Sequence, residues 1–121
     1  MANNCSNYLE LKLLQHIFTN NGGAAFTAPA DNKIFVSLHT ADPTDVTATA
    51  LANEITGDGY ARSNASDSLT WTIAESGGTT TAKNAQAIAF PQATGDYSAN
   101  VTHIGIWDED TSNRSSSNLL F

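Results

Sequence analysis

The sequence predicts a mainly β, antiparallel fold preceded by one amphipathic helix. Three observations lead to this class. Several short runs alternate apolar and polar residues with a period of two, turn signals rich in Gly, Pro and Asp separate these runs, and the one stretch with helical apolar spacing lies near the N-terminus. Many short strands between turns favour a sandwich or a barrel. A chain of 121 residues is close to the commonest single-domain size, so we expect one domain over residues 1–121.

The helix is expected over about residues 7–19. Leu9, Leu13 and Ile17 recur at i, i+4 and i+8. Asn7 is the expected N-cap, because Glu10 follows three residues later as in a capping box.

The helix has a wide apolar face, because Leu14 and Phe18 flank the first row of apolar residues at the same spacing. Such a face needs a surface to lie on. Two interpretations stay open: the face packs on the protein's own sheet, or it docks on a partner subunit.

The strands are expected from about residue 33 onward, after a connector over residues 22–32. The clearest strand covers residues 33–40, where Ile34, Val36 and Leu38 alternate with more polar neighbours and form the predicted buried face. The strand ends before Asp42-Pro43, since Pro lacks the N–H that a sheet needs.

A long surface loop is expected over residues 42–59, because this stretch is rich in Thr, Ala, Asp and Gly.

The later strands are short. Gly77-Gly78 predicts a hairpin turn. In the strand near residues 101–107, Ile104 and Ile106 should share one side. The expected strand segments are residues 60–63, 69–73, 79–81, 85–90, 101–107 and the run that begins at Asn118.

The charge excludes two classes of partner. The formal net charge is −7, and only five Lys or Arg residues are present. Such a chain cannot neutralise a run of phosphates, so we expect no direct binding to nucleic acid and no docking on an anionic membrane. No apolar run approaches the ~20 residues of a membrane span. No signal peptide is apparent, so we expect synthesis in a cytoplasm.

No catalytic, metal or cofactor motif stands out in the sequence. His39 and Asp42 are three residues apart, but no third ligand or nucleophile accompanies them. The acidic turn over residues 108–113 lacks the glycine and the final Glu of a calcium loop. Arg62 is expected in a local ion pair. We therefore predict a protein that is not an enzyme and holds no metal or cofactor.

Several strings, in order, carry a family resemblance. They are Leu13-Leu14-Gln15-His16-Ile17-Phe18, Phe26-Thr27-Ala28-Pro29, residues 34–43, Gly59-Tyr60-Ala61-Arg62, Ala87-Ile88-Ala89-Phe90-Pro91, residues 101–108 and Asn118-Leu119-Leu120-Phe121. Because these strings occur together and in this order, the chain resembles a widespread family of small bacteriophage virion proteins that are often labelled tail-fibre-like. The resemblance implies a jelly-roll-like β-sandwich and a structural role on the virion.

The leading hypothesis from this resemblance is a capsid decoration or cement protein on the capsid exterior. Its partners would be the major capsid protein and further copies of itself, as a dimer or alternatively a trimer. The expected contact residues are apolar side chains of the helix and of the chain end: Leu13, Leu14, Ile17, Phe18, Leu119, Leu120 and Phe121. Family members often continue beyond this string, so the last strand is expected to be open to a neighbouring chain.

The alternative hypothesis is a tail or head fibre, or a receptor-binding module that contacts the host surface. An exposed Trp71 or Trp107 beside polar loops would favour that role, because aromatic rings stack on sugars. A tryptophan buried in the core would not.

Overall fold

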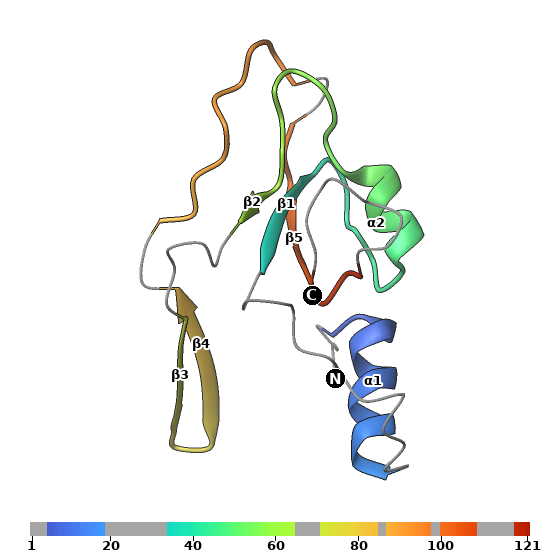
Figure 1. The fold of residues 1–121 in the computed structure, drawn as a ribbon, viewed down its shortest axis with the longest axis vertical. Coiled ribbons are helices and arrows are strands. Elements are labelled where there is room, and N and C mark those ends of the chain that lie inside the picture. Colours follow the sequence, from blue (N-terminus) through green and yellow to red (C-terminus); the bar gives the residue numbers. More distant parts are fainter. Residues whose placement is uncertain (1–4, 19–33, 65–70, 85–86, 98–99, 109–117) are drawn as a thin grey trace.

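Figure 1 shows a β-sheet body with two projections, one helical and one a hairpin. The structure is a computed structural model that describes residues 5–18, 34–64, 71–84, 87–97, 100–108 and 118–121. In chain order the elements are α1 (Asn7–Phe18), β1 (Phe35–His39), α2 (Thr47–Asn53), β2 (Ser63–Asn64), β3 (Trp71–Ser76), β4 (Thr79–Asn84) and β5 (His103–Trp107). The strand pairs of both sheets are antiparallel, which confirms the mainly β class.

The two sheets contain three strands and two strands. The two-stranded sheet is a solvent-exposed hairpin that stands away from the body. The described residues therefore form neither a jelly roll nor the face-to-face packing of a sandwich. The predicted connector over residues 22–32 and most of the acidic turn, residues 109–117, lie outside the described part of the chain.

β1 is the central strand of the body, in the order β2-β1-β5. Its Phe35 lies opposite Trp107 of β5. The chain end extends the sheet beyond β5, because Leu119 forms an isolated bridge with Trp107 and the N–H of Leu120 donates to the carbonyl of Ile106 at 2.7 Å. The segment that begins at Asn118 is thus paired within the chain.

The core lies on one face of this sheet. Its buried members are Phe35, Ala50, Trp107 and Leu119, and the half-buried Leu51 packs against them. These residues come from β1, α2, β5 and the chain end, so four segments far apart in sequence meet in one apolar cluster.

The predicted buried face of β1 is wrong in two of its three members. Val36 is buried, but Ile34 and Leu38 are only half-buried, whereas Ser37 and His39 on the other face are fully buried at 0% exposure. The polar pair is accommodated because Ser37 Oγ is hydrogen-bonded to His39 Nε2 and to the indole N–H of Trp107 inside the core. The prediction that Ile104 and Ile106 share one side of β5 is confirmed by the register. These two residues lie opposite Leu38 and Val36, which share one side of β1.

The N-cap of helix α1 is Ser6, so the prediction that Asn7 is the N-cap is wrong. The Ser6 hydroxyl accepts the N–H of Leu9 at 3.3 Å, and the Ser6 carbonyl accepts the N–H of Glu10 at 3.0 Å. The same hydroxyl donates to the carbonyl of Leu119. The start of α1 is therefore tied to the end of the chain.

The predicted loop over residues 42–59 contains a two-turn helix, α2, so that prediction is wrong for residues 47–53. Thr and Ala give this stretch no apolar period, and its helix is held by tertiary contacts instead. Ala50 is fully buried in the core. The carbonyl of Asn53 accepts the N–H of Thr40 at 3.0 Å, which fixes the end of α2 beside β1.

The hairpin prediction at Gly77-Gly78 is confirmed. Both glycines have positive φ, 59° and 81°, as a two-residue hairpin turn requires. The strand predicted over residues 85–90 is wrong for its described part, since residues 87–90 form no strand. Phe90 instead stacks on Tyr60, with 6.4 Å between ring centroids.

Candidate assembly interface

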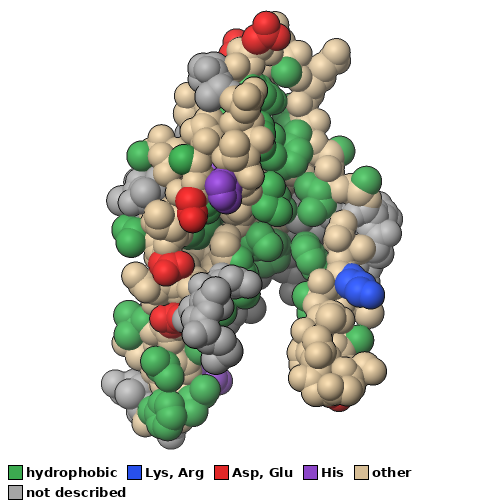
Figure 2. All heavy atoms as spheres, turned by 180° about the vertical axis from the view of Figure 1, so that it is seen from behind, with side chains coloured by type: hydrophobic (Ala, Val, Ile, Leu, Met, Phe, Trp, Pro, Cys, Tyr) green, Lys and Arg blue, Asp and Glu red, His purple; other side chains and the backbone are tan. Residues whose placement is uncertain are grey.

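The clearest candidate surface is the apolar face of α1, which projects from the body (Figures 1 and 2). Leu9, near the start of the helix, is buried with 7% exposure. Beyond it, five large apolar side chains are exposed, and we call them the α1 apolar face: Leu11 (54%), Leu13 (42%), Leu14 (54%), Ile17 (67%) and Phe18 (77%). Figure 2 shows hydrophobic atoms gathered at the free end of this projection.

The four helix residues predicted as contacts therefore all lie on an exposed apolar surface. Of the two interpretations left open by the sequence, packing on the protein's own sheet is not what this face does. Leu11 belongs to the same surface but was not among the predicted contacts; its i, i+3, i+7 relation to Leu14 and Phe18 was the signal that could have included it.

The three predicted contacts at the chain end divide into two groups. Leu119 and Leu120 are buried inside this chain, at 1% and 4% exposure, while Phe121 is 47% exposed. Asn118 fixes the segment, since its N–H and its side-chain amide donate to the carboxylate of Asp108 at 2.7 and 2.9 Å. Contact with a partner stays a prediction for Phe121 and the helix, while Leu119 and Leu120 serve the chain's own core.

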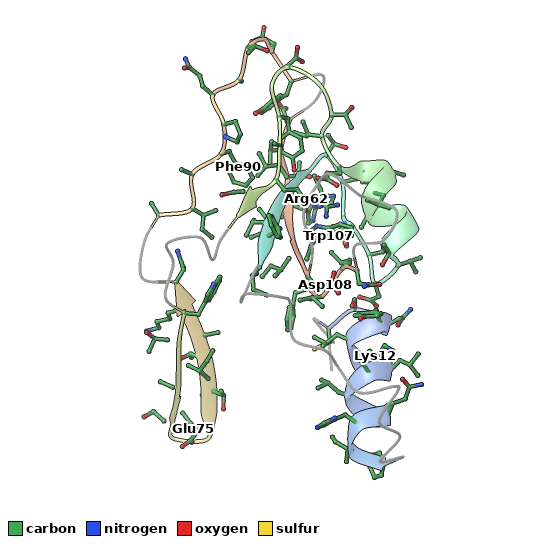
Figure 3. The ribbon with its side chains drawn as sticks, in the orientation of Figure 1. Lys12, Arg62, Glu75, Phe90, Trp107 and Asp108 are labelled. Atoms are coloured by element: carbon green, nitrogen blue, oxygen red, sulfur yellow. The ribbon has the colours of Figure 1, made fainter. Side chains whose placement is uncertain are left out.

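The β3–β4 hairpin is a second exposed projection (Figure 1). The register puts Trp71, Ile73 and Ala82 on one of its faces, and Ile73 is 65% exposed. A two-stranded hairpin without a covering layer is at best marginally stable in water. The carboxylate of Glu75 accepts the N–H of Gly78 at 2.9 Å, which fixes the turn locally (Figure 3). This projection was not among the predicted contacts.

A buried polar network lies under the sheet, and its first part is a chain of three side chains. The indole N–H of Trp107 donates to the Ser37 hydroxyl at 2.6 Å, and Ser37 Oγ lies 2.5 Å from Nε2 of His39. Ser37 Oγ also donates to the carbonyl of Gly105 at 3.4 Å, so this one hydroxyl joins Trp107, His39 and the backbone of β5.

The second part of the network is an ion pair between Glu54, which directly follows α2, and Arg62, which directly precedes β2. It confirms the predicted local pairing of Arg62. The guanidinium donates to both carboxylate oxygens of Glu54, at 2.9 and 2.8 Å, and both side chains are fully buried. The same guanidinium lies 3.7 Å from the centre of the Trp107 ring, a cation–π contact (Figure 3). Tyr60 completes the network, since its hydroxyl donates to Glu54 Oε1 at 3.0 Å and accepts the N–H of Leu38 at 3.0 Å.

Two pKa values are shifted by this environment. Burial lowers the pKa of His39, with the Arg62 charge acting in the same direction and the Glu54 carboxylate opposing it. Burial also raises the pKa of Tyr60, helped by Glu54. Both residues are therefore neutral near pH 7.

The network has the composition of a catalytic site but not its accessibility. A serine hydroxyl beside a histidine nitrogen is the geometry of an activated nucleophile. Here Ser37 and His39 are both at 0% exposure, so no substrate can reach them in this fold. Among the described residues no group of His, Cys, Asp and Glu side chains could hold a metal ion, and no described helix is long and apolar enough to cross a membrane.

Comparison with known proteins gives one match. A family model described as podophage GP4 fiber I protein gp80 matches residues 4–121. No curated protein and no solved structure matches the chain.

Proposed function

The chain belongs to the podophage GP4 fiber I protein gp80 family, a family of phage structural proteins, and from this membership we propose that it is a non-catalytic subunit of a virion fibre. The observation that carries the proposal is the extent of the match, which covers residues 4–121 of the 121-residue chain. The resemblance noted from the sequence had put capsid decoration first and a fibre second. The word fiber in the family description favours the fibre, so our proposal puts the fibre first.

The distribution of polar and apolar groups supports a structural role. The described side chains that resemble catalytic groups are paired with one another inside the core, Ser37 with His39 and Glu54 with Arg62. Of the exposed large apolar side chains, in contrast, five lie on α1 and one, Ile73, lies on the β3–β4 hairpin. A protein that functions by being built into an assembly places its groups in this way, since exposed apolar patches mark interaction surfaces.

Capsid decoration is the second candidate, with the major capsid protein as its partner. The observation in its favour is the presence of two separate projections, α1 and the β3–β4 hairpin, which would let one subunit touch two neighbours on a shell (Figure 1). Repeated modest contacts would then supply the stability through multivalency. Host binding through an exposed tryptophan has less support, because Trp107 is fully buried and Trp71 is half-buried.

The proposal is tested on purified virions of the phage that encodes the chain. Quantitative mass spectrometry should find the chain at the copy number of a fibre subunit, and immunogold labelling should decorate a fibre. A copy number close to that of the major capsid protein, with label spread over the shell, would establish the second candidate instead. Absence from purified virions would refute both.

A further inference from the structure

The α1 apolar face is large enough to serve as a binding surface. With 3.6 residues per turn, its five side chains fall within an arc of roughly 160°. Scaling their exposed fractions by about 180 Å² per side chain gives an exposed apolar area of roughly 500 Å². That is the size at which a patch on a soluble protein usually has a binding role.

The body holds α1 only at its start. Ser6 and Leu9 attach the first turn, and the exposed fraction then rises along the helix to 77% at Phe18. On the opposite side of the helix, Lys12 lies over the Tyr8 ring at 5.9 Å and His16 is exposed. Glu10, in the second turn, lies at the same angle as the apolar arc, but no charged residue interrupts the arc beyond Glu10, where all five apolar side chains are exposed.

We propose that the α1 apolar face is covered by the α1 helices of further copies of this chain. The area agrees with this occupant, because roughly 500 Å² is more than half of the ~800 Å² that each partner contributes to a stable interface. The charges agree as well. The whole chain carries −7, but α1 carries one acid, Glu10, and one base, Lys12, so the helices do not repel one another.

The width of the apolar arc indicates how many helices meet. A two-stranded coiled coil buries a narrow stripe of positions a and d. An arc of roughly 160° is wider than that stripe and suits a helix with two helical neighbours, as in a bundle of three. All five side chains lie beyond Glu10 along the helix, so the bundle would form away from the body and leave the β3–β4 hairpin free.

The first experiment measures self-association of the purified chain by analytical ultracentrifugation over a wide range of protein concentration. We expect a concentration-dependent oligomer, and Ile17→Asp should weaken its association at least tenfold because it buries a carboxylate in the apolar contact. The matched control is His16→Asp, which adds the same group to the polar side of the same helix and should leave association unchanged. A wild-type chain that stays monomeric at every concentration would overturn the proposal.

The second experiment identifies the contacting surface by disulfide cross-linking, in a background with Cys5→Ser. Ile17→Cys should cross-link two copies under mild oxidation, and His16→Cys should not. Equal cross-linking at the two positions, or an oligomer that does not cross-link through position 17, would overturn the proposal by moving the contact elsewhere. Fluorescence of Trp107 in a Trp71→Phe background confirms that each variant keeps a folded body.

This inference concerns copies of the isolated chain, whereas the proposed function concerns a place in the virion. A monomeric chain found on fibres would refute only the inference. An α1-dependent oligomer absent from virions would refute only the proposed function.

Discussion

Gly105→Ala should destabilise the fold, although alanine is normally the better residue in a strand. Gly105 has no positive φ, so general propensity predicts that alanine would stabilise the strand by about 0.5–1 kcal/mol. The packing predicts the opposite. A Cβ at this position would lie 2.8 Å from His39 Nε2, 2.9 Å from Ser37 Oγ and 3.0 Å from Trp107 Nε1.

The three atoms that the new methyl group would meet are the atoms that join Trp107, Ser37 and His39 by hydrogen bonds. Their side chains are fully buried, so none can move aside without disturbing the core. Overpacking of a core costs typically 1–3 kcal/mol, and a buried donor left unpaired costs about 1–3 kcal/mol more. We therefore expect Gly105→Ala to lower the free energy of unfolding by about 3 kcal/mol.

The measurement is urea denaturation followed by Trp107 fluorescence in a Trp71→Phe background. Gly95→Ala is the matched control, because its Cβ would also meet an atom at 2.8 Å, here the carboxylate oxygen of Asp58. Asp58 is exposed and can rotate away, so we expect a change within about 0.5 kcal/mol. If Gly105→Ala were neutral or stabilising, the close-packed arrangement of Ser37, His39 and Trp107 would be refuted.

Three further predictions follow from the same body. Arg62→Met should lower the free energy of unfolding by about 3–5 kcal/mol, because it leaves the Glu54 carboxylate buried without its ion-pair partner; a loss below ~1 kcal/mol in urea denaturation would contradict the buried pair. The folded state lowers the pKa of His39 below its ordinary 6.5, so protonation of His39 favours unfolding. The contribution of His39 to the free energy of unfolding should therefore be constant above pH 6.5 and should fall as the pH drops below 6.5. His39→Gln should remove that part of the pH dependence, and equal slopes for the two proteins between pH 6.5 and about pH 5 would refute the assignment. Ser6→Ala should cost about 1–2 kcal/mol, because it removes both the cap of α1 and the bond to the chain end; loss of helical signal at 222 nm in circular dichroism checks it.

The sequence predicted the elements whose local signals agree with their final environment. The α1 helix has a clear apolar period, and Gly77-Gly78 can adopt the two positive φ angles that the hairpin turn needs. The two-residue period of a strand also predicted that Ile104 and Ile106 of β5 face the same side.

The errors arose where tertiary contacts override local pattern. Apolar alternation favoured Ile34 and Leu38 as the core face of β1. Ser37 and His39 are buried instead, because the indole N–H of Trp107 on another strand donates to Ser37, which is hydrogen-bonded to His39. No local signal specifies that partner. Helix α2 lacks an apolar period and depends on the burial of Ala50, which sequence reasoning could not locate.

The sequence predicted the residues of the candidate surface on α1 but not their exposure. The apolar side chains of α1 are visible in the sequence, but a sequence cannot tell whether such a face packs on its own sheet or stays uncovered. The exposed fractions of Ile17 and Phe18 decide this point. The chain end has an equally apolar pattern, yet Leu119 and Leu120 are used inside the body.

The central proposal is that this phage structural protein is a fibre subunit and that its α1 helices meet in the assembly. A cryo-electron microscopy reconstruction of the intact virion tests it most directly. We expect density for the β2-β1-β5 body in a fibre, with the α1 apolar face buried against α1 of neighbouring copies. A fibre density without this chain, or one in which Ile17 and Phe18 face solvent, would contradict it.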